Sequence, residues 1–135
     1  RRIALDDLPC GGSIMIFNRQ RDILEILAGY NRFFKQESCG LCTPCRAGNF
    51  ILEKKLDLFA DKLARAADIE TVRAWGKIMK LTCRCGLGKT APNALLGALD
   101  NFPEVFEGQT ATNPDRLSKG FDLDEAVRAY ERFSS

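Results

Sequence analysis

The chain lacks histidine, has no long apolar run and carries no glycine-rich nucleotide loop among its 135 residues. No uninterrupted apolar stretch approaches the roughly 20 residues of a membrane-spanning helix, so we expect no direct membrane insertion. The 20 basic residues are interspersed with 18 acidic ones, which gives no electrostatic reason to expect nucleic-acid binding. The pattern Gly-x-Gly-x-x-Gly is missing as well, so we expect no dinucleotide site within this chain.

The remaining composition, 45% hydrophobic and 28% charged, is that of one soluble domain. A chain of this length can bury roughly two thirds of its unfolded-state surface. Residues 1–7 are too acidic and too poor in apolar residues for a signal peptide. Six cysteines without an export signal favour metal ligation in a reducing compartment, so we expect a cytoplasmic protein. The chain starts with Arg1 rather than Met, which favours a piece of a longer polypeptide.

Three of the cysteines occur close together, in the motif Glu-Ser-Cys-Gly-Leu-Cys-Thr-Pro-Cys-Arg at residues 37–46. Three thiolates spaced by two residues converge on one polynuclear metal centre. A 4Fe-4S cluster is normally held by such a loop together with a fourth cysteine from elsewhere in the fold. The spacing therefore predicts Cys39, Cys42 and Cys45 as ligands of an iron-sulfur cluster.

The fourth ligand is expected downstream, in a Thr-Cys-Arg-Cys-Gly-Leu-Gly segment. Cys85 and Cys83 are both candidates there, and Cys10 is a more remote third choice. We favour Cys85 because Gly86 and Gly88 follow it. Glycines let the backbone come close to a bulky cluster and leave N-H groups free to point at its sulfur atoms.

A structural zinc site is the main alternative interpretation of the same cysteines. Cys42 with Cys45, and Cys83 with Cys85, would supply two pairs of ligands. Zinc would leave Cys39 unused, and the chain has no histidine. We therefore place the iron-sulfur cluster first, ahead of both zinc and a redox disulfide.

Apolar residues recur three or four positions apart in four segments, which predicts four helices. They are expected at about residues 19–36, at about 45–66, from a cap at Asp68 to residue 82, and from Thr90 and Pro92 to residue 102, before Pro103. Short connections favour a mainly α fold, an antiparallel four-helix bundle with a 4Fe-4S cluster at one end, faced by the starts of the second and fourth helices. Aromatic residues at helical spacing are expected to pack in the core: Phe33, Phe34, Phe50, Phe59 and Trp75.

The four-helix domain is expected to span residues 19–106. Residues 1–18 are interpreted as the end of a preceding domain or a linker, with a short strand at residues 13–17 whose partner lies upstream or in another polypeptide. Residues 107–135 are interpreted as a polar linker and a C-terminal extra helix capped by Asp122.

The motif at residues 37–46 and the string Cys-Gly-Leu-Gly-x-Thr-Ala-Pro-Asn at residues 85–93 resemble those of a known family. It is the iron-sulfur domain of the NADH-binding flavoprotein subunit of respiratory complex I and its relatives. The relatives include the diaphorase subunit of soluble NAD-reducing nickel-iron hydrogenases and subunits of NAD-dependent formate dehydrogenases. The variant Cys-Arg-Ala-Gly-Asn at residues 45–49 is more similar to the hydrogenase diaphorase subunit.

The resemblance covers about residues 11–106 and implies the ligand set Cys39, Cys42, Cys45 and Cys85. It implies electron transfer through the cluster between FMN, which exchanges a hydride with NAD(H), and the iron-sulfur clusters of partner subunits. FMN and NAD(H) would bind an upstream domain or another chain, and the implied partners are small iron-sulfur subunits and hydrogenase subunits.

The chain would then be part of an NAD-dependent oxidoreductase, with a NAD-reducing hydrogenase ahead of complex I and formate dehydrogenase. No catalytic acid, base or nucleophile is expected in it, because the chemistry belongs to the cofactor. An alternative of another class is a non-redox interaction module whose metal only holds the bundle together.

Overall fold

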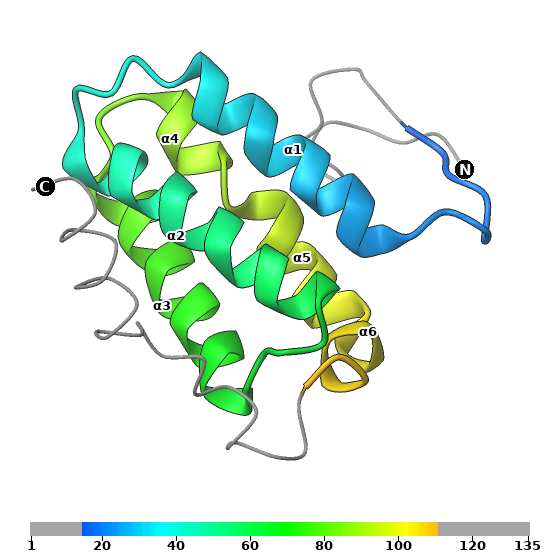
Figure 1. The fold of residues 1–135 in the computed structure, drawn as a ribbon. Helices are drawn as coiled ribbons and strands as arrows, with labels where there is room; N and C mark the ends of the chain where they lie inside the picture. Colours follow the sequence, from blue (N-terminus) through cyan, green and yellow to red (C-terminus); the bar gives the residue numbers. More distant parts are fainter. Residues whose placement is uncertain (1–14, 111–135) are drawn as a thin grey trace, which may run out of the picture.

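The computed structural model describes residues 15–110, and six helices occupy this range (Figure 1). They are α1 (Ile23–Glu37), α2 (Thr43–Ala60), α3 (Ala66–Thr82), α4 (Gly86–Thr90), α5 (Asn93–Asn101) and α6 (Pro103–Glu107). Helix α1 packs on α2, α2 on α3, and α3 on α5. Short connections reverse the chain between these four long helices, so the mainly α, antiparallel four-helix bundle predicted from the sequence is confirmed.

The first two helices start at residues suited to helix ends. The Asp22 carboxylate caps α1 by accepting the Leu24 backbone N-H at 2.8 Å. Helix α2 begins directly after Cys42 and has Pro44 in its first turn, where the missing proline N-H costs no helical hydrogen bond. The two helices are antiparallel neighbours, so the loop between them lies at one end of the bundle.

The core runs between all four long helices and closes under α6. Phe59 and Phe106 are fully buried, and their rings meet edge to face with centroids 5.2 Å apart. Two other predicted core aromatics lie on the surface instead, since Phe33 is 54% exposed and Phe50 is 51% exposed. The buried face of α1 is rotated away from Phe33 because it includes a polar residue, Asn31, that an apolar pattern cannot reveal.

The second helix ends at Ala60, well before the boundary predicted near residue 66. Lys62 takes a positive φ of 58°, and the Leu63 and Ala64 N-H groups both donate to the Leu58 carbonyl, which closes the helix end. Nothing in the apolar spacing of this segment distinguishes such a turn from one more turn of helix.

Asp68 does not precede the third helix as predicted but lies within its first turn. Its carboxylate accepts the Arg65 backbone N-H at 2.7 Å and pairs with Lys55 at 2.5 Å. Partial burial opposes ionisation of this carboxyl, but the bonds from Lys55 and Arg65 outweigh it and lower the Asp68 pKa. The side chain therefore stabilises the start of α3 and links it to α2.

The predicted fourth helix corresponds to α5, and the short α4, which was not predicted, precedes it. Helix α4 starts directly after Cys85 and includes Thr90, which was expected to open the fourth helix and whose hydroxyl instead donates back to the Gly86 carbonyl at 2.9 Å. Pro92 then precedes α5, and Pro103 opens α6 besides ending the helix before it. Proline fits the first turn of a helix, so it marks a new start as readily as an end.

Residues 15–17, the described part of the expected strand, form no strand. The β contact recorded within residues 15–110 is an isolated bridge between Ala64 and Thr110. The remainder of the expected strand, Cys10 and the helix predicted after Asp122 lie outside the described residues.

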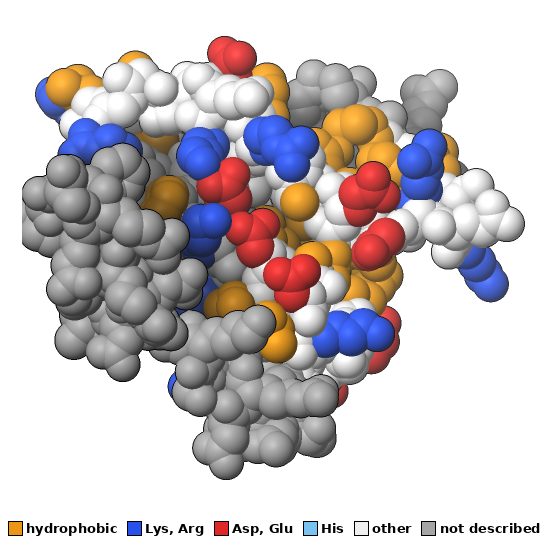
Figure 2. Space-filling view, viewed as in Figure 1, with side chains coloured by type: hydrophobic (Ala, Val, Ile, Leu, Met, Phe, Trp, Pro, Cys, Tyr) orange, Lys and Arg blue, Asp and Glu red, His pale blue; other side chains and the backbone are white. Residues whose placement is uncertain are grey.

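Charges of both signs intermingle over the face shown in Figure 2, which includes α1 and α2. Among the described residues, ion pairs join neighbouring helices, such as Lys35 on α1 with Glu53 on α2 at 2.5 Å. This arrangement agrees with the absence of a basic patch in the sequence. No helix between residues 15 and 110 combines the length and apolar character needed to cross a membrane.

Candidate iron-sulfur centre

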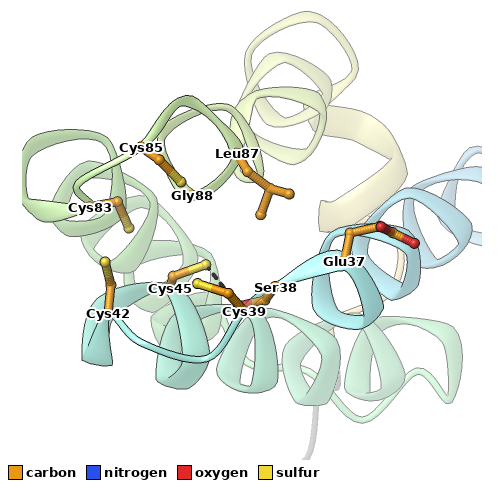
Figure 3. Close-up of a pocket in the computed structure, with 9 residues that line it drawn as sticks. All are labelled: Glu37, Ser38, Cys39, Cys42, Cys45, Cys83, Cys85, Leu87 and Gly88. Carbon is orange, nitrogen blue, oxygen red and sulfur yellow. Dashed lines mark hydrogen bonds between the residues drawn. The ribbon is translucent and has the colours of Figure 1, made fainter.

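Five cysteines meet around one cavity at the end of the bundle where two loops lie together (Figure 3). The cavity has a volume of about 190 Å³. A water molecule takes about 30 Å³, so there is room for a group several times larger. The four cysteines predicted as ligands all line it, and Cys83 joins them: the set is Cys39, Cys42, Cys45, Cys83 and Cys85.

The first cysteine loop, between α1 and α2, takes its conformation from Gly40 and its neighbours. Gly40 has a φ of +73°, a left-handed conformation in which other residues are strained. Its N-H donates to the Ser38 hydroxyl oxygen at 3.2 Å, and its carbonyl accepts from the Arg46 guanidinium. Arg46 therefore fastens the loop to the start of α2, which places the cysteines on either side of Gly40 at the cavity.

The second loop needs a glycine at position 88. A Cβ atom there would lie 2.8 Å from the Cys83 sulfur and 3.2 Å from the Cys45 sulfur. At Gly86, which was also expected to allow a close approach, an added Cβ would meet nothing within 4 Å. The close approach thus depends on Gly88, one turn of backbone after the predicted ligand.

Cys85 is exposed and precedes the first turn of α4. The nearby backbone N-H groups of Gly88 and Leu87 favour the charged form of the sulfur and lower the Cys85 pKa, despite the opposing desolvation. The thiolate, the form that binds metal, is therefore favoured at this position.

Cys83 has the opposite environment. It is 3% exposed, and burial raises its pKa, followed by the neighbouring charges of Cys45, Cys42 and Cys85. A thiol held in the neutral form is a poor metal ligand. The contrast with Cys85 agrees with the preference drawn from the flanking glycines.

Cys45 is the buried member of the first motif, at 5% exposure. Its Sγ lies 3.3 Å from the Ser38 hydroxyl and 3.5 Å from Nδ2 of Asn49. Sequence reasoning did not identify these two side chains. A useful signal was present, because Asn49 follows Cys45 by four residues and so lies one helical turn along the same face.

Two helix starts supply further N-H groups to the cavity. Cys42 caps α2 and Cys85 caps α4, so the unpaired N-H groups of both first turns lie at the thiols. The partial positive charge at these ends favours an anion. The prediction that the second helix starts at the cavity was right, since α2 does so. At the second cysteine loop, the helix that starts there is the short α4 and not the predicted fourth helix.

The cysteines surround a space and do not converge on a point. Within residues 15–110, no three side chains of the types His, Cys, Asp and Glu are grouped so as to hold one metal ion. A zinc site would require every sulfur about 2.3 Å from a single ion. Thiols spread around a cavity, with amide donors beside them, fit a polynuclear iron-sulfur cluster better than a single zinc ion.

Known proteins match this chain in sequence and in structure. The family model described as the NADH-ubiquinone oxidoreductase-F iron-sulfur binding region matches residues 25–109. The alpha subunit of the NAD-reducing hydrogenase HoxS of Cupriavidus necator is 41% identical over 132 residues, which are 98% of this chain and 22% of that protein. One subunit of the NADH-quinone oxidoreductase of Aquifex aeolicus is 30% identical over 109 residues, which are 78% of this chain and 26% of that protein.

A crystal structure of NAD+-reducing [NiFe]-hydrogenase in the H2-reduced state superposes with a TM-score of 0.80 at 32% identity, over 98% of this chain and 23% of the hydrogenase chain. The chain thus spans about a quarter or less of the length of these relatives. Since the family model matches well over half of the residues, the chain belongs to the family of NADH-ubiquinone oxidoreductase-F iron-sulfur binding regions.

Proposed function

We propose that this chain transfers electrons through a 4Fe-4S cluster held by Cys39, Cys42, Cys45 and Cys85. The observation that carries the proposal is the convergence of these four thiols, from two distant loops, on one cavity. The lowered pKa of Cys85, and the burial that raises the pKa of Cys83, support the choice between them. When bound, the cluster supplies one-electron oxidation and reduction.

The protein's own groups have three tasks in this proposal. Thiolates bind iron, backbone N-H groups near Gly88 and at the start of α2 offset the negative charge, and the bundle keeps water from the inner side of the cavity. Cys45 is buried, whereas Cys39 and Cys85 are exposed, so the outer side is where electrons can enter and leave.

We place this electron transfer in a larger oxidoreductase. An FMN- and NAD(H)-binding region, upstream or in another chain, would exchange electrons with the cluster. Iron-sulfur clusters of partner subunits would be its second electron-transfer partner. A cytoplasmic NAD-reducing hydrogenase is our first choice, because the hydrogenase relative is 41% identical over nearly the whole chain. The complex I type is second, supported by the 30% identity to the Aquifex aeolicus NADH-quinone oxidoreductase.

The same reasoning leads us to propose residues 19–106 as the iron-sulfur domain. Residues 1–18 would then be the end of a preceding domain or a linker, and residues 107–135 a linker with a terminal helix. Support comes from the bundle, which starts at Ile23 and closes with α6 at Glu107.

Metal analysis tests the proposal. Iron, sulfide and zinc should be measured on anaerobically purified chain, followed by low-temperature EPR before and after dithionite. We expect about four iron and four sulfide per chain, with a signal that appears on reduction. One zinc without sulfide, or a cluster that never changes oxidation state, would instead support the non-redox module.

A further inference from the structure

The Cys45 sulfur has two polar side chains against it, deep in the cavity. Asn49 is 1% exposed and directs its side-chain amide at Cys45, with Nδ2 3.0 Å from the backbone carbonyl oxygen and 3.5 Å from Sγ. The Ser38 hydroxyl lies 3.3 Å from the same sulfur (Figure 3). An amide NH2 group has two hydrogens, so both bonds from Asn49 can exist together.

The orientation of the Asn49 amide is fixed by what it faces. Its Oδ1 atom is buried and has no hydrogen-bond partner among the described residues. If the amide were turned over, Oδ1 would face the carbonyl oxygen and the sulfur of Cys45, and neither group donates when Cys45 is a thiolate. An unpaired buried oxygen lowers stability. The amide therefore takes the orientation in which Nδ2 faces Cys45, although this leaves its own Oδ1 without a hydrogen-bond partner among the described residues.

Neighbouring groups hold these donors in place. Asn31 on α1 is buried, and its Nδ2 donates to the Asn49 backbone carbonyl at 3.0 Å, which fixes α1 against α2 at this turn. The Ser38 oxygen accepts the Gly40 N-H, so the Ser38 hydroxyl hydrogen is left to point at Cys45. The surroundings thus preorganise hydrogen-bond donors at one corner of the cavity.

We propose that Asn49 is a positioning residue that donates an N-H bond to the Cys45 thiolate and raises the reduction potential of the cluster. The inference rests on the proposed function, because it requires Cys45 to be a ligand. Reduction adds one electron and so one negative charge, and a donor at a ligand sulfur stabilises the more negative state more strongly. Removing the donor should therefore shift the potential downward.

A threonine at position 49 should keep the hydrogen bond to the Cys45 carbonyl, here called the helix bond, while losing the bond to the Cys45 sulfur. Elsewhere in this chain a threonine hydroxyl donates to the carbonyl four residues earlier, at 2.8 Å for Thr71 and 2.6 Å for Thr82. In Asn49→Thr the single hydroxyl hydrogen would bond the Cys45 carbonyl in the same way, which leaves none for the sulfur. Asn49→Leu removes both bonds.

A matched control lies at the far end of the bundle. Asn101 on α5 makes the same type of bond, from Nδ2 to the Gly97 carbonyl at 2.6 Å, but is remote from the cavity (Figure 1). Asn101→Leu therefore removes a helix bond of the same type, at an exposed position, without touching a cysteine.

The experiment is an anaerobic redox titration with dithionite, followed by EPR, on the whole chain and its three variants. We expect lower midpoint potentials for Asn49→Thr and Asn49→Leu, and the wild-type potential for Asn101→Leu. Equal potentials in all four proteins, each with its cluster, would overturn this inference and leave the proposed function standing. Loss of the cluster in both position-49 variants would also overturn it, because the role would then be structural. A wild-type chain without iron and sulfide would refute both proposals.

Discussion

The two cysteines of the second loop allow a crossed test of the ligand assignment. Cys85 is exposed and favours the thiolate, whereas Cys83 is 3% exposed and favours the thiol. Replacement of Cys85 by serine removes a proposed ligand, and a hydroxyl is a poor substitute for a thiolate in an iron-sulfur site. We expect iron and sulfide in Cys85→Ser to fall below about half of the wild-type values, and to stay near wild type in Cys83→Ser.

Stability of the metal-free chain should follow the opposite order. An exposed substitution at Cys85 changes the free energy of unfolding by no more than about 0.5 kcal/mol. At Cys83, serine places a hydroxyl in a buried site beside Gly88, which should cost about 1–3 kcal/mol if the hydroxyl finds no partner. Urea unfolding of each metal-free variant measures this difference.

The combination of the two assays decides the assignment. Low iron with unchanged stability identifies Cys85 as a ligand, and wild-type iron with lower stability identifies Cys83 as a packing residue. Wild-type iron in Cys85→Ser, or iron lost from Cys83→Ser alone, would refute the argument from pKa and burial.

Three further substitutions test the site and the fold separately. Gly88→Ala places a Cβ 2.8 Å from the Cys83 sulfur, so we expect lower iron content with an unchanged helical circular dichroism spectrum; normal iron loading would contradict the close approach. Asp68→Asn weakens the bond to Lys55 and should cost about 1–3 kcal/mol at pH 7. Because the folded-state pKa of Asp68 is lowered, its contribution to the free energy of unfolding is present above the unfolded pKa of about 3.9 and is lost as pH falls through the folded pKa. The free energy of unfolding of the variant, measured with urea, should therefore depend less on pH in that range. Phe106→Ala empties a fully buried ring position and should cost about 3–5 kcal/mol in thermal or urea unfolding, with iron per folded chain unchanged.

The four long helices could be predicted because each buries a regular stripe, as Leu52, Leu56 and Phe59 do on α2. Their ends were less predictable. The left-handed Lys62 that closes α2 is a residue without special turn propensity, and the pairing that starts α3 joins Asp68 to a lysine on another helix. Such ends depend on tertiary contacts, which local pattern does not contain.

The site was more predictable than the helix ends, since cysteine spacing specifies its own chemistry. The cysteines at 39, 42, 45 and 85 all line the cavity, although their role as ligands stays a prediction. What the spacing could not reveal is the polar environment of each sulfur. Asn49 and Ser38 are common residue types, and their importance appears when both are found against Cys45.

The distance between the two cysteine loops is set by helix packing and not by the loops themselves. A Cβ at Gly48, one turn after Cys45 on α2, would overlap the Met79 side chain on α3. Met79 is fully buried, and its carbonyl accepts the Cys83 N-H at 3.1 Å. The close contact of α2 with α3 at this level thus lies next to both loops. Because close-packed helices resist displacement, the bundle preorganises the cavity, and the charge that a cluster gains on reduction meets donors already in position.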